Sequence, residues 1–459
     1  MISRVHIIFK NAMIIILLMA CTMNMPLQKV FASDNIADTS ASHINSNNPF
    51  RNELSEGFDA SLRILPYASY QGVADSTQNP DNDFLRLPRF MGNMEIRPDL
   101  FLQFRKLEFS VKPRANIQRL VWENGTVNGD KDWEDDWYIN EWFFKLGVTD
   151  SLFLSYGREN LQWGPSYLFS PSNPFFEDNG RMNPKMEVPG MGFARLVWVP
   201  SFKWSASFIV NTDKGRQIFE PGNFHKSYAV KIDYTGSEEY AGLVLSKTEK
   251  EGYRIGAFGG WTATDAVLLY GDIGFSQRND ALYPTEDSIS PFGVSMLAVD
   301  ENSSPWNGTI MMGTSYTFMA GPTILVEYLY NDAGYSDKQA RGYYQLRRSA
   351  CNAYNEYGPI SGISRMVLGQ TVDPGMRFIR KNYLVLQYRQ NDIRDVLNLS
   401  FSWIYNVDDK GGRWIYSLEY AVGDHVQIFS IGSLNTGSAD TEFRSVFDTS
   451  FMLGMEYTF

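Results

Sequence analysis

FMLGMEYTF, residues 451–459, alternates apolar side chains with others without a break. The apolar positions are every second residue from Phe451 to Phe459, and the positions between them are Met452, Gly454, Glu456 and Thr458. A period of two residues is typical of a β-strand that presents one apolar face. This stretch therefore predicts a strand with one face toward an apolar phase and the other toward water.

The same alternation recurs along the chain in segments of ten or more residues. Between 397 and 405, for example, Leu397, Phe401 and Trp403 alternate with Asn398 and Ser402. A strand that crosses a bilayer at a tilt needs about 9–11 residues. We expect strands at 57–70, 92–103, 106–121, 134–147, 150–159, 190–199, 202–212, 226–235, 239–248, 252–262, 264–278, 306–319, 322–332, 380–390, 394–406, 412–422, 424–434 and 448–459.

Short and long connections alternate between these segments. Phe104-Arg105 and Val148-Thr149 are tight links, whereas 71–91 and 333–379 are long. Tight periplasmic turns that alternate with long external loops are typical of outer-membrane barrels. We therefore expect an all-β fold, a transmembrane antiparallel up-and-down barrel of about 18 strands, or about 16 if the first strand or 264–278 is misread. A soluble β-sandwich also alternates, but its strands are shorter and its apolar face is richer in aliphatic residues.

The composition agrees with a barrel and argues against two other classes of protein. Aromatic residues make up 15% of the chain, as barrels with aromatic girdles require. The mean hydropathy of −0.28 is too low for a bundle of membrane helices. A formal net charge of −11 opposes binding to nucleic acid, so no such partner is expected.

The N-terminal segment has the features of a targeting signal. Arg4 and Lys10 accompany the short apolar stretch 12–20, AMIIILLMA, and Val30-Phe31-Ala32 offers a cleavage site. The apolar stretch is about half as long as a membrane span. Leu18-Met19-Ala20-Cys21 also resembles a lipobox, so lipidation at Cys21 remains an alternative to cleavage after Ala32.

These features divide the chain into three parts. We expect a signal peptide at 1–32, a flexible periplasmic leader at 33–56 and a single barrel at 57–459. A chain that ends in an alternating strand with a terminal Phe resembles the outer-membrane β-barrels of Gram-negative bacteria. The resemblance implies localisation in the bacterial outer membrane, contact with its lipid and lipopolysaccharide, and recognition of Phe459 by the outer-membrane assembly machinery.

One long connection, 160–189, has the composition of a packed loop. It contains Pro165, Pro171, Pro174, Pro184 and Pro189, which restrict its backbone, and five aromatic residues that need burial. It is the third long external connection, and in general porins that loop folds inward and narrows the channel. We expect a constriction or a ligand-contacting element here; a loop that only packs against the wall is the alternative.

The same segment resembles a second family. Gly157-Arg158, then Trp163-Gly164-Pro165, then Asn173-Pro174 is similar to a Trp-Gly-Pro loop of capsule-assembly barrels of the Wzi type. Such barrels are taken to bind surface polysaccharide. In the Wzi-type pattern an Ala commonly follows the Asn, whereas this chain has Pro174.

Charged and polar residues of the loop and of the expected inner faces are the candidate site. If Arg114 and Arg195 face Glu177 and Asp178, they set up a transverse field across the opening; wall-to-loop salt bridges are the alternative reading. The candidates for contact with a pore or ligand are Arg114, Arg158, Trp163, Asn173, Glu177, Asp178, Arg195 and Lys203.

No enzyme chemistry is indicated. The mature part of the chain holds three histidines, His43, His225 and His425, and no G-x-S-x-G motif. We expect no catalytic residue, no metal and no cofactor. The sequence thus predicts a porin-like channel for passive diffusion of small hydrophilic solutes, narrowed by loop 160–189; the alternative is a plugged Wzi-like barrel that binds surface or capsular polysaccharide.

Overall fold

The computed structural model describes residues 53–54, 56–176, 179–216, 224–249, 252–277, 280–298 and 306–459. The expected signal peptide at 1–32 and most of the expected leader at 33–56 lie outside the described residues, as do the candidate residues Glu177 and Asp178.

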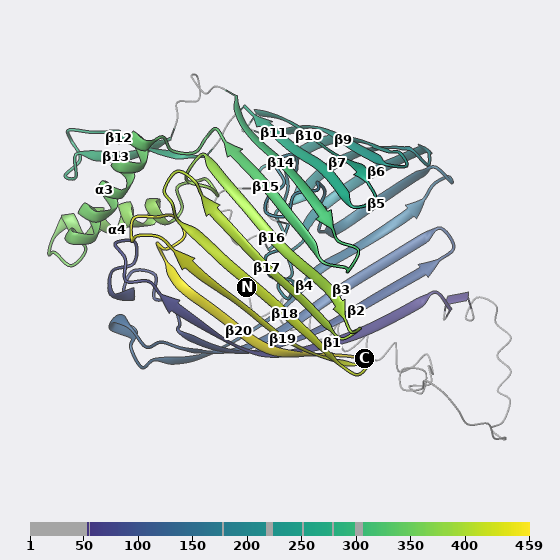
Figure 1. Ribbon diagram of the computed structural model, residues 1–459, viewed down its shortest axis with the longest axis horizontal. Coiled ribbons are helices and arrows are strands. Elements are labelled where there is room, and N and C mark those ends of the chain that lie inside the picture. The colour runs from purple at the N-terminus through teal and green to yellow at the C-terminus, as the bar shows by residue number, and fades with distance from the viewer. Residues whose placement is uncertain are drawn as a thin grey trace. The chain divides into compact units, whose positions relative to one another are not determined.

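Eighteen antiparallel strands form one sheet (Figure 1). Every segment expected from the sequence is a strand, so the prediction of about 18 strands is confirmed and the alternative of about 16 is wrong. The strands are β1 (Phe58–Val73), β2 (Phe90–Phe104), β3 (Leu107–Val121), β4 (Lys131–Gly147), β5 (Leu152–Glu159), β6 (Met191–Ser201), β7 (Trp204–Asp213), β8 (Ser227–Thr235), β9 (Glu239–Thr248), β10 (Gly252–Thr264), β11 (Val267–Ser276), β14 (Asn307–Thr317), β15 (Thr323–Asn331), β16 (Asn382–Ile393), β17 (Leu397–Asn406), β18 (Gly412–Val422), β19 (Val426–Thr436) and β20 (Phe447–Thr458).

The sheet closes on itself, because β1 pairs with β20 as well as with β2. Tyr70 lies opposite Phe451, and Ala68 lies opposite Leu453. An unpaired strand edge in hydrocarbon leaves backbone N–H and C=O groups unsatisfied at several kcal/mol each, and closure removes that edge.

The two faces of the strands differ as the alternation predicts. On β7, Phe208 is 48% exposed on the outer face, whereas the neighbouring Ile209 is 2% exposed on the inner face. On β20, Phe451, Leu453 and Met455 are all exposed, and Glu456, which follows Met455, points inward. An outer surface of exposed apolar side chains is that of a transmembrane barrel. Among the described residues, no helix is both long and apolar enough for a helical membrane span.

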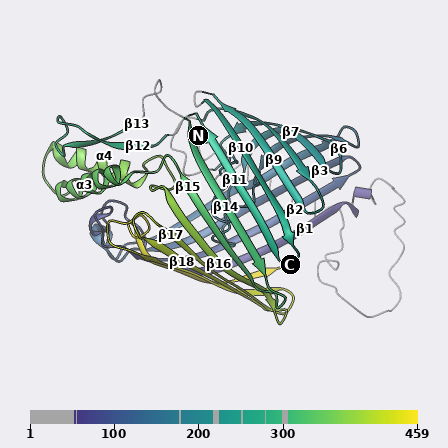
Figure 2. The same ribbon diagram turned by 45° about the horizontal axis from the view of Figure 1, so that its top comes forward.

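The long connections hold structure that the sequence did not predict. The expected loop 279–305 contains the hairpin of β12 (Leu282–Glu286) and β13 (Val294–Ala298), and the loop 333–379 contains the helices α3 (Asp337–Ala353) and α4 (Pro359–Val372). Short 3-10 turns lie at η2 (Pro80–Asn82) and η3 (Gly125–Val127). The hairpin and the helices gather at the end of the barrel away from the short turns (Figure 2).

Local sequence explains where α3 begins. The Ser336 hydroxyl accepts the N–H of Gln339, and the Gln339 side chain accepts the N–H of Ser336, which is a capping box. The signal is a Ser followed three residues later by Gln, and it was visible in the sequence. The connection 333–379 was expected to be a loop, although the buried residues of α3 recur with a helical period.

The outer face gives the first testable prediction. Phe208→Lys places a charge on the lipid-facing side near the middle of β7, and we expect it to lower the free energy of unfolding by about 2–4 kcal/mol. Urea titration of the protein folded into lipid vesicles measures this loss. Ser205→Lys, on the inner face of the same strand and beside Asp233, is the matched control and should cost little. Equal losses in both variants would contradict the assignment of lipid to the outer face.

Candidate functional site

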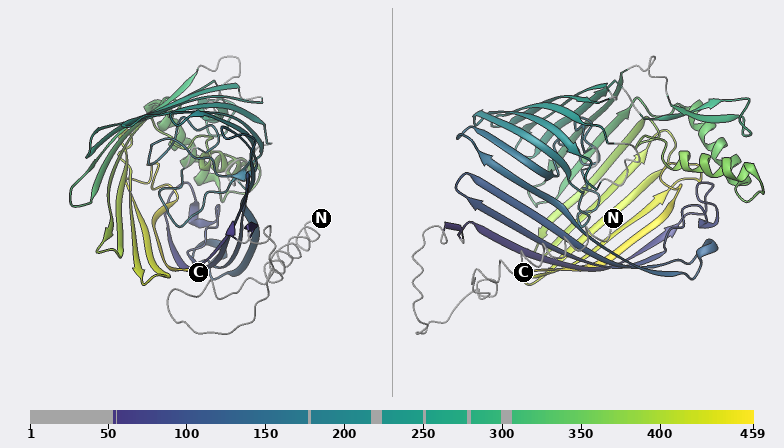
Figure 3. Two further views of the ribbon diagram at one scale, coloured as in Figure 1. Left: turned by 90° about the vertical axis from the view of Figure 1, so that its right-hand side faces the viewer. Right: turned by 180° about the vertical axis from the view of Figure 1, so that it is seen from behind.

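Residues 160–190, here called the inward loop, join β5 to β6 and run inside the barrel. A view along the barrel shows the loop crossing the lumen, with α3 and α4 behind it within the outline of the wall (Figure 3). The expectation that this connection packs inside the barrel is therefore confirmed. It contacts the inner face of the wall on opposite sides of the lumen.

Asn173 shapes the middle of the loop. Its side-chain carbonyl accepts the N–H groups of Phe175 at 3.0 Å and Phe176 at 3.1 Å, and its amide donates to the carbonyl of Leu161 at 3.0 Å. Asn side chains often form such turns, and Pro174 fixes the backbone in between. Asn173 is fully buried, and these three hydrogen bonds all join it to other residues of the loop.

Two apolar patches on the inner wall hold the loop. Phe175 and Phe176 pack with Leu161 and Met191 against inward side chains of β6, β7 and β8, namely Phe193, Ile209 and Ala229. Trp163 packs beside them, with its ring centroid 6.0 Å from that of Phe175. Across the lumen, Tyr167, Leu168 and Phe169 pack with Leu329, Tyr383, Val385, Ile404 and Ile415 of β15 to β18. Because these wall residues would otherwise face water, covering them favours the inward position of the loop.

A pair of glycines lets the loop approach β10 and β11. Gly256 and Gly274 are opposite one another in the ladder. A Cβ at Gly274 would lie 2.1 Å from the Pro171 carbonyl oxygen, and one at Gly256 would lie 2.6 Å from the Ser172 backbone. Only glycine leaves room there for the loop backbone.

Two inward carboxylates bind the same part of the loop. Asp272 on β11 accepts the Ser170 hydroxyl and the Ser172 N–H, both at 2.8 Å. Glu327 on β15 accepts the Tyr167 N–H at 2.6 Å and the Tyr270 hydroxyl at 2.9 Å. Each carboxylate therefore pairs loop N–H groups that have no strand partner, as buried backbone requires.

Opposite charges hold the end of the loop. Lys185 lies 3.0 Å from Glu456 on β20, and Glu187 accepts Arg114 of β3 at 2.6 and 2.9 Å. The side chain of Arg114 is only 2% exposed. Charge-assisted bonds of this geometry are strong when they are shielded from water.

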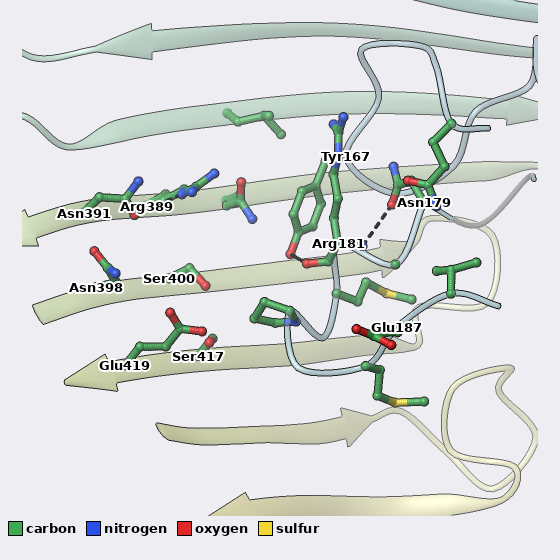
Figure 4. A pocket seen from close by; sticks show the side chains of 18 of the residues that line it. Tyr167, Asn179, Arg181, Glu187, Arg389, Asn391, Asn398, Ser400, Ser417 and Glu419 are labelled. Carbon is green, nitrogen blue, oxygen red and sulfur yellow. Dashed lines mark hydrogen bonds between the residues drawn. The ribbon is translucent and has the colours of Figure 1, made fainter. Parts of the chain in front are cut away.

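The loop and the wall enclose a polar cavity of about 690 Å³ (Figure 4). Asn179 and Arg181 of the loop face Arg389 and Asn391 of β16 and Asn398 of β17 across it. Since Asn391 and Asn398 lie beside the short β16–β17 turn, the cavity extends toward the short-turn side, which is the periplasmic side of such barrels. Amides, hydroxyls and charges of both signs line it, so its surface is polar.

The described candidate residues lie in the inward loop, in three strands of the wall and in one short turn. Trp163 and Asn173 belong to the loop, and Arg114 binds Glu187 and Asp99. The Arg158 guanidinium donates to the Ile139 carbonyl at 3.1 Å, and Arg195 lies 3.4 Å from Glu159. Lys203 is exposed in the short turn between β6 and β7. The structure thus brings Arg114 to the loop through Glu187, a residue that the sequence did not single out.

Sequence reasoning missed Lys185, Glu187 and Asp272. For the first two, a signal was present: opposite charges two residues apart, between Pro184 and Pro189, in a loop expected to fold inward. Asp272 alternates with outward apolar residues on β11, and this period was a signal for an inner face. Its loop partners could not be found, because they are about one hundred residues away in the chain.

Four external connections form a compact structure at the other end of the barrel. Its apolar core includes Met296 of β13, Tyr343 and Leu346 of α3, and Leu368 of α4. Arg347 is fully buried and donates to Thr77 at 3.0 Å, Gln78 at 3.2 Å and the Ala439 carbonyl at 2.9 Å. We call this structure the external cap, defined as residues 74–89, 280–298, 332–381 and 437–446 of the described chain.

Glu442 joins the cap to the wall. Its carboxylate accepts the Tyr383 hydroxyl at 2.5 Å, the Asn406 amide at 2.8 Å and the Ile379 N–H at 3.2 Å. Burial, together with the nearby Asp409 carboxylate, raises the pKa of Glu442 to about 7. A proton is therefore held there at a pH where an ordinary glutamate is ionised.

The described residues offer no obvious metal site. Among them, no group of three or more His, Cys, Asp or Glu side chains is placed to bind a metal ion.

The glycine pair gives a prediction. Gly274→Ala forces the Pro171 backbone away from the wall, and overpacking of this kind costs about 1–3 kcal/mol. We expect faster protease cleavage within the inward loop of the folded protein. Gly271→Ala on the same strand, where a Cβ lies 3.5 Å from its nearest neighbour, is the control. If both variants were cleaved like the unaltered protein, the glycine pair would not position the loop.

Glu442 gives a prediction about pH. Because its pKa rises from the ordinary 4.5 to about 7 in the folded protein, its contribution is complete below pH 4.5 and is lost as pH rises through 7. Protease cleavage of the external cap should be faster at pH 8 than at pH 5.5. Glu442→Gln, which mimics the protonated form, should remove this difference, whereas Glu356→Gln at an exposed position should keep it.

Solved structures show where this fold is found. No protein-family model and no curated protein matches the chain. OccAB1 of Acinetobacter baumannii has a TM-score of 0.53 at 12% identity over 88% of this chain and 97% of that one. OccK11 (OpdR) of Pseudomonas aeruginosa has 0.52 at 10% identity over 88% and 96%, and the outer membrane protein OprD of the same organism has 0.50 at 12% over 87% and 94%. The chain has the 18-strand antiparallel barrel fold of these outer-membrane porins.

Proposed function

We propose that this outer-membrane barrel is a channel, not an enzyme, through which small hydrophilic solutes diffuse passively. The observation that carries the proposal is the inward loop, which contacts β6–β8, β10–β11 and β15–β18 and thereby narrows the lumen. A barrel of 18 strands is too wide for its own side chains to fill. A loop inside it therefore sets the size of whatever passes.

The chemistry of the opening supports polar solutes. The cavity beside the loop is lined by amides and hydroxyls, such as Asn179, Gln387 and Ser400, with Arg389 and Glu419 on the wall. A solute that carries several hydrogen-bonding groups can exchange water for these side chains as it passes. A lipid tail would leave them unpaired, which disfavours apolar solutes.

Within this proposal the candidate residues have two kinds of role. Arg114, Trp163 and Asn173 hold the loop in place, and Arg158, Arg195 and the loop acids Glu177 and Asp178 tune the field that a charged solute meets. Lys203 would act at the periplasmic mouth, where it is exposed.

The ends of the chain and its surroundings belong to the same proposal. We infer a signal peptide at 1–32, a periplasmic leader at 33–56 and delivery to the assembly machinery through Phe459. Exposed aromatic residues at the long-loop end of β4, among them Trp133 and Trp137, support contact with lipopolysaccharide. The fold comparisons give no support to the alternative of a Wzi-type barrel that binds polysaccharide.

Conductance in planar bilayers tests the channel. The purified protein should insert with discrete conductance steps, and deletion of 163–176 should enlarge the steps because it removes the segment that crosses the lumen. A shift in gel mobility on heating verifies that each variant is a folded barrel. A folded protein that passes almost no ions, with or without the deletion, would contradict the proposal and favour a plugged binding protein.

A further inference from the structure

Lys185 and Glu187 of the inward loop reach opposite sides of the place where the barrel closes. Lys185 contacts Glu419 of β18, Gln427 of β19 and Glu456 of β20. Glu187 contacts Arg63 of β1, Arg97 of β2, Arg114 of β3 and Asn140 of β4. These strands are consecutive around the barrel, with the β20–β1 pair in the middle.

The Lys185 contacts are shielded from water. Its ammonium lies 3.0 Å from Glu456 and 3.4 Å from Glu419, and its side chain is 9% exposed. The same ammonium lies 5.2 Å from the centre of the Phe429 ring on β19. A nearly buried lysine needs such partners, so Lys185 is held firmly on the β18–β20 side.

The Glu187 contacts are equally dense. Arg114 binds both carboxylate oxygens, at 2.6 and 2.9 Å, and Arg63 binds one at 3.2 Å. Arg97 lies 3.9 Å from the carboxylate and also donates to the Lys185 carbonyl at 2.7 Å. The loop backbone between the two side chains is thus fixed to β2 as well.

The β1–β20 pair differs from every other pair of neighbouring strands in the wall. All the others are consecutive along the chain of the barrel, whereas β1 and β20 are its first and last strands. Elsewhere in the wall, a connecting turn or loop limits how far two neighbouring strands can separate. Between β1 and β20, only hydrogen bonds and side-chain contacts resist it.

The backbone ladder is interrupted at this place. Pairing between β1 and β20 passes from Ile64↔Tyr457 to Tyr67↔Gly454 and omits Leu65 and Pro66. Pro66 has no N–H to donate, and the gap on β20 contains Glu456, which binds Lys185. Pairing between β2 and β3 likewise passes from Ile96↔Ala115 to Leu100↔Val111, beside Arg97 and Arg114.

We propose that Lys185 and Glu187 form an ionic clamp that holds the first and last strands together where their backbone pairing is interrupted. The loop that narrows the lumen is then also the element that locks the barrel closed. The link between clamp and lumen width rests on the proposed channel function, whereas the effect on closure does not.

The test compares clamp variants with a matched ion pair of the wall. Lys185→Met and Glu187→Gln each remove one arm of the clamp, and Lys185→Arg keeps the charge. Lys145→Met removes an ion pair, 3.0 Å long, between the adjacent strands β3 and β4. In the full-length protein, both clamp variants should lower the temperature at which the folded barrel converts to the unfolded gel mobility, and Lys145→Met and Lys185→Arg should shift it less.

A disulfide across the closure makes the test specific. In a Cys351→Ser background, one pair of substitutions is Ala68→Cys with Leu453→Cys, at positions paired across β1 and β20. The control pair is Leu269→Cys with Thr314→Cys, at positions paired across β11 and β14. The oxidised β1–β20 disulfide should restore the transition temperature of Lys185→Met and Glu187→Gln, and the β11–β14 disulfide should not. Equal rescue by both disulfides, or clamp variants that unfold like Lys145→Met, would overturn the proposal.

Conductance separates this inference from the proposed channel. If the barrel conducts, the clamp variants should show larger or noisier steps, and the β1–β20 disulfide should leave that change in place because it does not hold the loop. If no variant conducts but the pattern of unfolding and rescue is as described, the channel proposal fails and the clamp stands.

Discussion

The need to pair every backbone N–H and C=O group in hydrocarbon governs this protein. It requires a closed sheet, and it places the first strand beside the last, although they are the most distant strands in the chain. Closure in turn separates two surfaces. Phe208 and Leu453 lie on the outer one, toward lipid, and the inner one keeps the polar and charged side chains of the same strands.

A closed wall of this size encloses a lumen that is too wide for wall side chains to fill. The inward loop occupies part of this space, and three kinds of contact hold it there. Aromatic side chains cover apolar patches on opposite walls, the Gly256–Gly274 pair admits the loop backbone, and Asp272 and Glu327 accept loop N–H groups. Each contact depends on the strands being in register, so the loop adopts its position only on a correctly formed wall.

Charges inside the barrel are arranged as partners and are not spread evenly. Arg114 is almost completely shielded from water and bound to Glu187 and Asp99, and Lys185 is bound to Glu419 and Glu456. Removing one charged side chain from such a group leaves its partners desolvated and unpaired. These groups therefore constrain the structure more strongly than surface ion pairs do. The less enclosed side chains beside the loop, such as Arg389 and Asn391, remain available to a solute in the cavity.

The sequence by itself determined the strands, their number and the inward loop, because a period of two, tight turns and proline-rich aromatic composition are local properties. It also placed Arg114, Arg195 and Glu456 on inner faces. Only the tertiary structure decided that Glu187 meets Arg114, that Asp272 meets Ser170, and that α3 and α4 form a cap with distant loops. These contacts join residues far apart in the chain, and their geometry exists only after the sheet has closed. Alternation fixes which face a side chain takes, but neither its height nor its neighbour across the lumen.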